Sequence, residues 1–361
     1  MSYWKIIKSF IKNGFNQTND FSVFTNILVI NEANLGNLIL STPVSSALKA
    51  NFQVANITYL MKPEYKDLLL SMCPYIDEAI DCSLYDDLEK KISLIESFSP
   101  DLIVDLFSLN ELSLSWFSNA KYLKFVKPDL YSGNIKHLVR SYLDTIIPIC
   151  PIIPKPFFPT LFPESVSKST FAEICQKYNL DNKPIIGIVA GINPNYPSRG
   201  WISEAWSYVI DNILHKYNVT PVLIGFDEER TSCEVVRMQV DGNCVNLAGL
   251  MDLAELAVFI SHCELIIAPD TGINHLAVAI GKPTIGLYGP TPAYFTGPFG
   301  GEHLVLDQSR SCECHEYNTC KVAALHQPGK CMNRIMVPEV LDKIAEVLNS
   351  EYVLKLENNS N

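Results

Sequence analysis

Short apolar runs alternate with longer amphipathic stretches along the first part of the chain. The runs are "NILVI" (26–30), "ITYLM" (57–61) and "DLIVDLF" (101–107), and "PVSSALKANF" and "PEYKDLLLSM" stand between them. Uninterrupted apolar runs of this length are typical of buried strands in a parallel sheet, and the amphipathic stretches are typical of helices that cover it. The order therefore predicts a β-α-β-α-β arrangement.

The same pattern restarts after a segment rich in proline. Six prolines lie between residues 148 and 163, and a helix cannot cross such a segment because proline lacks the backbone N–H. Four further strand candidates follow: "PIIGIVAG" (184–191), "TPVLIGF" (220–226), "ELIIAPD" (264–270) and "PTIGLYG" (283–289). The amphipathic stretch "VPEVLDKIAEVLNSEYVLKL" predicts a closing helix.

These patterns predict an α/β fold of two Rossmann-like domains that face a central cleft. We expect an N-terminal extension over residues 1–21, an N-terminal domain over 22–147, a Pro-rich linker over 148–165 and a C-terminal domain with its closing helix over 166–361. Ligands of such sheets bind at the carboxyl ends of the strands.

Charge and hydropathy narrow the classes of partner. The net charge of −11 over 361 residues argues against nucleic-acid binding, which needs clustered Lys and Arg. No apolar run approaches the ~20 residues of a membrane span, and the start lacks a signal-peptide cleavage site. We therefore expect a cytoplasmic protein. The first residues, "MSYWKIIKSFIKNGF", are compatible with a basic amphipathic helix on anionic lipid at the inner membrane, and equally with a helix packed on its own domain.

The stretch "APDTGINHLA" (268–277) carries the first candidate chemistry. An aspartic protease needs two Asp-Thr-Gly turns in two β-rich lobes, and this α/β chain has one, so that reading fails. The alternative places Thr271, Gly272 and Ile273 at a helix N-terminus, whose free N–H groups suit a phosphate. Asp270 could cap this helix. On the simplest interpretation Asp270 is only a cap and His275 only a helix residue.

A longer stretch resembles a known family. "PDTGINHLAVAIGKPTIGLYGPTPA" resembles the C-terminal signature of glycosyltransferase family 9, the heptosyltransferases. "ILVINEANLGNLILSTP", "PSRGWISEAW" and "VNLAGLMDLAELAVFISHCELIIAPDTG" are similar to its other segments. The resemblance implies a GT-B fold, inversion at the anomeric carbon and no required metal. It also implies a nucleotide-sugar donor, ADP-heptose by analogy, and a lipopolysaccharide core or related glycan as acceptor, met at the inner face of the membrane.

The resemblance also implies donor-binding roles, position by position. Arg199 stands where the family has a Lys on the phosphates, and a guanidinium can bind them bidentately. Glu229 would bind the ribose hydroxyls, and Met251 would pack on the adenine. Thr271, Gly272 and Ile273 would bind the diphosphate, and Asp270 and His275 would orient sugar and phosphates.

The sequence departs from the family on the acceptor side. The family's catalytic turn contains Gly-Asp, and that Asp is the general base, whereas this chain has Gly36-Asn37. An amide cannot take a proton near neutral pH. Glu32 is a substitute close in sequence, and Asn31 stands where the family has a basic residue. The chain is therefore either an active transferase, a non-catalytic nucleotide-sugar-binding relative, or a sugar-nucleotide enzyme of similar fold.

The 11 cysteines fall into two groups. Seven lie scattered among apolar neighbours, as reduced buried thiols do. The other four form a C-x-C-x₅-C-x₁₀-C pattern with enough ligands for a structural zinc, although reduced thiols or a disulfide fit it as well. These four are Cys312, Cys314, Cys320 and Cys331.

Overall fold

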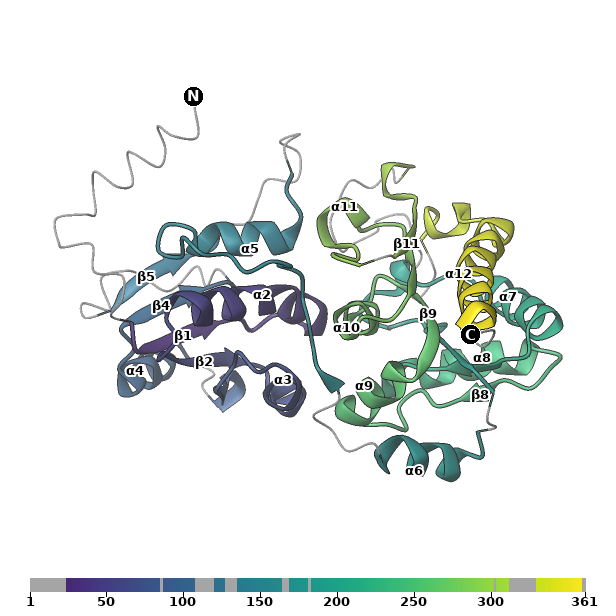
Figure 1. Cartoon of the computed structure of the whole chain (residues 1–361), viewed down its shortest axis with the longest axis horizontal. Coiled ribbons are helices and arrows are strands. Elements are labelled where there is room, and N and C mark those ends of the chain that lie inside the picture. Colours follow the sequence, from purple (N-terminus) through teal and green to yellow (C-terminus); the bar gives the residue numbers. More distant parts are fainter. Residues whose placement is uncertain are drawn as a thin grey trace.

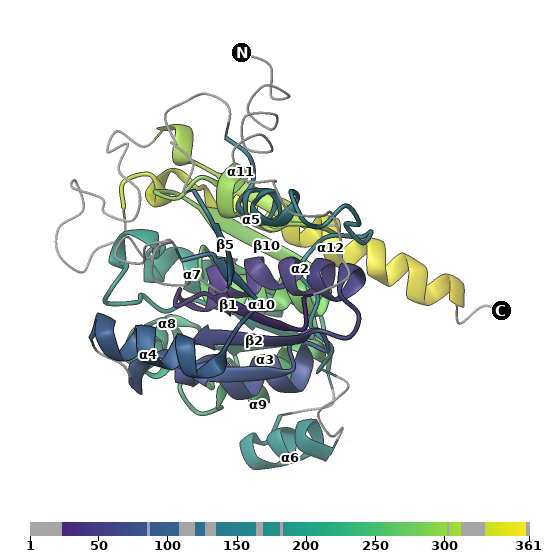
Figure 2. The same ribbon diagram turned by 90° about the vertical axis from the view of Figure 1, so that its left-hand side faces the viewer.

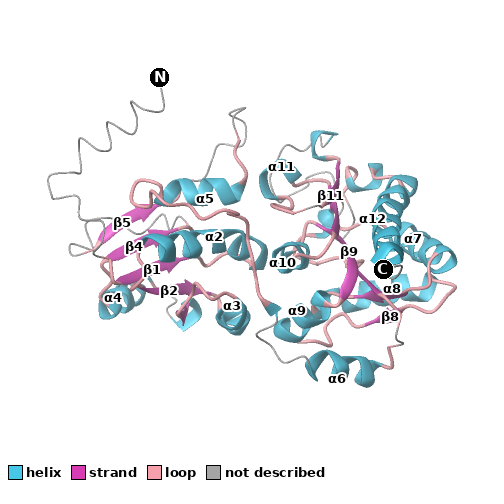
Figure 3. Ribbon diagram, in the orientation of Figure 1, coloured by secondary structure: helices cyan, strands magenta, loops and turns pink. Residues whose placement is uncertain are grey.

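A computed structural model describes residues 24–358, except 85–86, 108–119, 127–134, 164–168, 181–182, 302 and 312–328. The polypeptide forms two α/β units, each built on one parallel sheet (Figures 1 and 3). The expected N-terminal extension, and with it the question of a lipid-binding helix, lies outside the described residues.

The N-terminal sheet has the strand order β3-β2-β1-β4-β5, with every neighbouring pair parallel. Its strands are β1 (Asn26–Ile30), β2 (Asn56–Met61), β3 (Glu78–Asp81), β4 (Leu102–Asp105) and β5 (Lys121–Lys124). Its helices are α2 (Leu35–Asn51), η2 (Pro63–Tyr65), α3 (Lys66–Met72), η3 (Cys82–Leu84), α4 (Leu88–Phe98) and α5 (Leu138–Ile146).

The C-terminal sheet has the order β11-β10-β9-β6-β7-β8 and is also parallel throughout. Its strands are β6 (Ile185–Ile188), β7 (Thr220–Leu223), β8 (Val245–Asn246), β9 (Cys263–Pro269), β10 (Thr284–Tyr288) and β11 (Leu304–Asp307). The α-helices are α6 (Ser169–Tyr178), α7 (Ser203–Lys216), α8 (Arg230–Gln239), α9 (Leu253–Ser261), α10 (Gly272–Ile280), α11 (Ala293–Thr296) and α12 (Val337–Asn358). The short 3₁₀ helices are η6 (Pro197–Arg199), η7 (Asp227–Glu229), η8 (Ser309–Ser311) and η9 (Met332–Arg334).

Both strand orders are those of Rossmann-like sheets, in which chain order reverses beside the first strand. The expected fold class, α/β with two such domains, is confirmed. The seven predicted apolar runs all correspond to strands. Prediction missed β3, β5, β8 and β11, whose residues are at most half-buried and therefore lack an uninterrupted apolar run.

Helix α2 begins eight residues earlier than the run "PVSSALKANF" indicated, and Pro43 lies inside it. Proline removes the N–H that would bond the Ile39 carbonyl. The Thr42 hydroxyl donates to that carbonyl instead, at 2.8 Å. The helix therefore continues through the proline.

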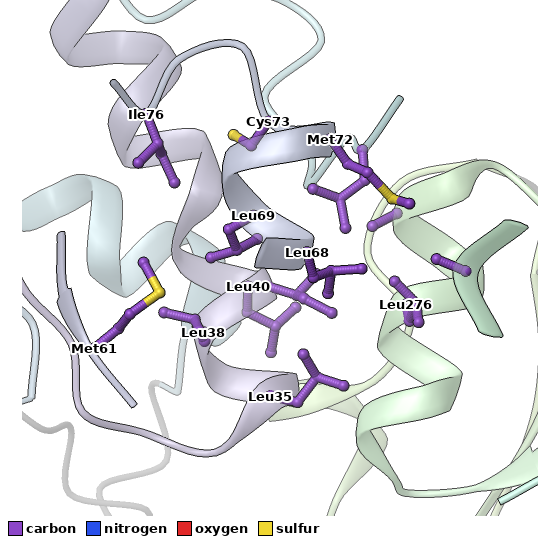
Figure 4. Close-up of a cluster of buried hydrophobic side chains, with 14 of the residues drawn as sticks. Leu35, Leu38, Leu40, Met61, Leu68, Leu69, Met72, Cys73, Ile76 and Leu276 are labelled. Atoms are coloured by element: carbon purple, nitrogen blue, oxygen red, sulfur yellow. The ribbon is translucent and has the colours of Figure 1, made fainter. Parts of the chain in front are cut away.

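The two domains share one hydrophobic cluster. Leu35 and Leu68 of the N-terminal domain face Leu276 of α10 across the domain boundary (Figure 4). The linker ties the domains further, because Phe162 N–H donates to the Met72 carbonyl and Leu161 N–H to the Ala279 carbonyl, both at 2.8 Å. Helix α12 packs against α7, β10 and β11 of the C-terminal domain, and its end projects from the body in Figure 2.

The first turns of α2 and α10 pack against each other at this boundary. A Cβ on Gly36 would lie 2.6 Å from His275 Cδ2, and a Cβ on Gly272 would lie 3.0 Å from Leu35 Cβ. Real Cβ atoms do not approach other atoms as closely as 2.6 Å. The contact therefore needs glycine at position 36.

Candidate functional site

A cavity of about 760 Å³ lies between the carboxyl ends of the two sheets. It is lined by loops that follow β1, β2 and β4 of the N-terminal domain and β6, β7 and β9 of the C-terminal domain. After the roles that the family resemblance leads us to expect, we call the N-terminal side the acceptor wall and the C-terminal side the donor wall. The predicted site residues in its lining are Asn37, Arg199, Glu229, Met251, Asp270, Thr271, Gly272 and His275.

The donor wall is centred on the turn between β9 and α10. Thr271 is the N-cap of α10, and its hydroxyl accepts from the Asn274 N–H at 3.4 Å. The expectation that Asp270 caps this helix is wrong, because Asp270 pairs with other side chains. The first N–H groups of an α-helix have no partner within the helix, so those of Gly272 and Ile273 are available here. The Ile273 side chain is fully buried and does not line the cavity.

Asp270 is a buried carboxylate that contacts the guanidinium of Arg199 and the imidazole of His275. Arg199 Nη1 lies 3.2 Å from Asp270 Oδ2 and donates to the Asp270 carbonyl at 3.2 Å, and His275 Nε2 lies 3.5 Å from Oδ1. Burial alone would raise the pKa of Asp270, but Arg199 and His275 outweigh it and lower the pKa to about 2. Asp270 is therefore an anion that orients Arg199 and His275, and a weak proton acceptor.

Arg199 comes from the short η6 helix after β6. Its guanidinium carbon lies 4.7 Å from the centre of the Tyr196 ring, a cation–π contact. With 20% of its side chain exposed, Arg199 presents a fixed positive charge at the cavity beside the start of α10. A fixed cation beside a helix N-terminus is an arrangement that binds phosphate groups.

Glu229 lies at the other end of the donor wall. Its side chain is 1% exposed, and Oε2 accepts from the Phe226 N–H at 2.9 Å. Two glycines make room for it, since Cβ atoms on Gly191 and Gly225 would lie 2.5 Å and 2.8 Å from Glu229 atoms. Burial, together with the neighbouring Glu228, raises the pKa of Glu229 to about 7. Glu229 thus changes protonation near neutrality at the cavity wall.

The acceptor wall carries a polar chain that crosses to the donor wall. Lys62 Nζ donates to Asn34 Oδ1 at 2.6 Å, and Asn34 Nδ2 donates to the Tyr196 hydroxyl at 3.0 Å. Asn34 is the N-cap residue of α2, yet its side chain makes no capping bond. Asn37, the third residue of the same helix, is exposed and lines the cavity.

Glu32 is not where prediction expected a substitute base. It does not line the cavity. Its carboxylate forms an ion pair with Lys91 of α4, at 2.7 Å, with both side chains less than 15% exposed. A carboxylate held in such a pair is unavailable to a substrate in the cavity, so the prediction for Glu32 was wrong.

Sequence reasoning missed Asn34, Lys62, Tyr65 and Tyr196, which all line the cavity. Their position in the sequence could have identified them, because each lies in a segment that follows the carboxyl end of a predicted strand. Tyr65 lies with its hydroxyl against the Leu35 backbone, and burial and Glu64 raise its pKa.

Three predicted metal ligands, Cys312, Cys314 and Cys320, lie outside the described residues. The fourth, Cys331, is 3% exposed. The seven scattered cysteines are free thiols, five buried and two half-buried. Within the described part of the chain no cluster of metal-binding side chains occurs, and no helix there is long and apolar enough to span a membrane.

The chain is similar in sequence to proteins of one glycosyltransferase family. Residues 159–326 match the model of glycosyltransferase family 9 (heptosyltransferase). The chain is 24% identical over 314 residues to lipooligosaccharide heptosyltransferase 2 of Haemophilus influenzae, covering 78% of this chain and 88% of that protein.

Two solved structures share the fold. The first is the Escherichia coli ADP-heptose lipopolysaccharide heptosyltransferase II, with a TM-score of 0.71 and 20% identity over 91% of this chain and 100% of that one. The second is an Escherichia coli heptosyltransferase with ADP, with a TM-score of 0.61 and 14% identity over 89% of this chain and 99% of that one. In these matches and in the GT-B arrangement of its two domains, the chain is similar to the heptosyltransferases of glycosyltransferase family 9, and these similarities support its being a glycosyltransferase.

Proposed function

We propose that the protein transfers a heptosyl residue from ADP-heptose to a hydroxyl of a lipopolysaccharide core or a related surface glycan, at the cytoplasmic face of the inner membrane. The observation that carries this proposal is the turn at Asp270, where a helix N-terminus, Arg199 and His275 meet in a cavity reached by both domains. The names of the similar proteins, which act on lipopolysaccharide or lipooligosaccharide, suggest the substrate class.

In the proposed donor pose, the diphosphate lies on the N–H groups of Gly272 and Ile273 and against Arg199. Met251 packs on the adenine and the Glu229 carboxylate accepts from the ribose hydroxyls, because both line the same wall. Asp270 keeps Arg199 and His275 in position, and the heptose extends toward the acceptor wall.

Transfer follows from this pose as an inverting displacement. The acceptor hydroxyl attacks the anomeric carbon from the acceptor wall, and the bond from that carbon to the diphosphate oxygen breaks. ADP leaves with the electron pair, and its developing charge is met by Arg199 and the α10 N-terminus.

A non-catalytic nucleotide-sugar-binding protein is the alternative, and Asn37 is the observation that favours it. An exposed amide lies at the position where the family has its base, and it cannot accept a proton near neutral pH.

A product assay separates the two functions. Purified protein is given ADP-heptose and heptose-deficient lipopolysaccharide, and ADP release and acceptor mass are followed while calorimetry measures donor binding. Donor binding with a heptose-sized gain in acceptor mass supports transfer. Donor binding with neither product nor ADP supports the alternative, and absence of donor binding contradicts both.

We also propose that transfer needs no divalent cation, because Arg199 and the helix N-terminus already neutralise the diphosphate. Turnover should be unchanged by EDTA. Loss of turnover in EDTA that magnesium restores would contradict this.

The cysteine loop is proposed to hold a structural zinc through Cys312, Cys314, Cys320 and Cys331. Elemental analysis of protein purified without chelators should find about one zinc per chain. Protein without zinc would leave reduced thiols or a disulfide as the state of this loop.

A further inference from the structure

The proposed transfer requires a proton acceptor near the acceptor hydroxyl, and several carboxylates are excluded by their contacts. Glu32 is paired with Lys91. Asp105, fully buried at the end of β4, accepts from the Tyr122 hydroxyl at 2.7 Å and the Phe107 N–H at 3.1 Å. Asp270 is committed to Arg199 and His275 on the donor wall. None of these three can receive a proton from an acceptor bound against α2.

Among the described residues, four carboxylates line the cavity, and one of them, Glu64, belongs to the acceptor wall. Its side chain is exposed, and within the described part of the structure no hydrogen bond or ion pair engages it. Glu228 and Glu229 come from η7 of the C-terminal domain, beside the proposed ribose site.

The residues on either side of Glu64 contact the start of α2. Glu64 is the second residue of η2, directly after β2, which pairs with β1. Lys62, two residues before it, bonds to Asn34, and the hydroxyl of Tyr65, one residue after it, lies against the Leu35 N–H. Both flanking residues therefore contact the turn that carries Asn37.

We propose that Glu64 is the general base of this glycosyltransferase, in place of the missing aspartate at position 37. As the acceptor oxygen bonds to the anomeric carbon, its proton passes to a Glu64 carboxylate oxygen, while the carbon–diphosphate bond breaks and ADP leaves. This assignment rests on the proposed transfer.

The test compares Glu64→Gln with the native protein, using ADP-heptose as donor and heptose-deficient lipopolysaccharide or water as acceptor. We expect kcat to fall by about 10²–10⁴-fold, the usual contribution of a positioned base, with the Kd for ADP-heptose unchanged. The fall in native kcat at low pH should be absent in the variant. Glu64→Asp should retain part of the activity, and Glu96→Gln, an exposed residue of α4 away from the cavity, should behave as native.

The outcomes separate this proposal from the proposed function. Native protein that binds ADP-heptose yet releases no ADP would overturn the transfer and the base together. Native turnover that Glu64→Gln leaves unchanged would overturn the base alone. A Glu64→Gln variant that raises the acceptor KM with native kcat and native pH profile would show that Glu64 only binds the acceptor, which also overturns the assignment.

Discussion

The two walls of the cavity differ in how their polar groups are held. On the donor wall, Arg199 and His275 both contact Asp270, and all three side chains are mostly buried. On the acceptor wall, Asn37 and Glu64 are exposed. Side chains that are fixed before the ligand binds lose little conformational entropy on binding. Exposed side chains adopt their final conformation only when the ligand binds. The polar groups of the donor wall are therefore positioned before a ligand binds, whereas those of the acceptor wall depend on the ligand for their final geometry.

The strongest test of this contrast introduces a carboxylate at position 37 on the acceptor wall, with and without Glu64. Asn37→Asp in the Glu64→Gln background should raise kcat about 10-fold or more, because it supplies a carboxylate where the family has its base. In the native background the gain should be small, since Glu64 already accepts the proton. A large gain in the native background, measured as ADP release, would indicate that no base operates in the natural protein.

A smaller effect is expected when the donor wall loses one of its paired charges. Arg199→Ala or Asp270→Ala should weaken ADP-heptose binding by about 1–3 kcal/mol, the range for charge-assisted hydrogen bonds. Calorimetry measures the change, and Arg237→Ala on α8, exposed and outside the cavity lining, is the matched control. Unchanged affinity in both donor-wall variants would show that the diphosphate binds elsewhere.

The smallest effect concerns the protonation of Glu229. Because the pKa of Glu229 is about 7, its carboxyl group is mostly protonated near pH 6. It must lose that proton before it can accept hydrogen bonds from the ribose hydroxyls as an anion. Donor affinity should therefore rise about tenfold between pH 6 and 8. The rise should vanish in Glu229→Gln. A slope that persists in this variant would assign the titration to another group.

Sequence reasoning succeeded where structure is local. The turn at Asp270 joins an apolar strand to a helix within a few residues, so pattern and family motif predicted both the elements and most of the donor wall. Arg199 was found in the same way, although its bond to Asp270 spans 71 positions.

The acceptor wall could not be predicted as well, because its contacts join distant segments. The direction of Glu32 was decided by Lys91, 59 residues away, and the bond from Asn34 to Tyr196 spans 162 positions. Neither pairing leaves a pattern in the linear sequence. The four short strands were missed because half-exposed strands mix polar and apolar residues.

The contact between the first turns of α2 and α10 has a consequence for how related sequences can vary. Gly36 leaves room for the His275 imidazole, and Gly272 leaves room for Leu35, so each domain supplies the space that a side chain of the other fills. The two positions of each pair are expected to covary. A relative that carries a larger residue at position 36 should carry a smaller one at 275, and a domain exchanged between two relatives should dock correctly only where the residues at both pairs remain compatible.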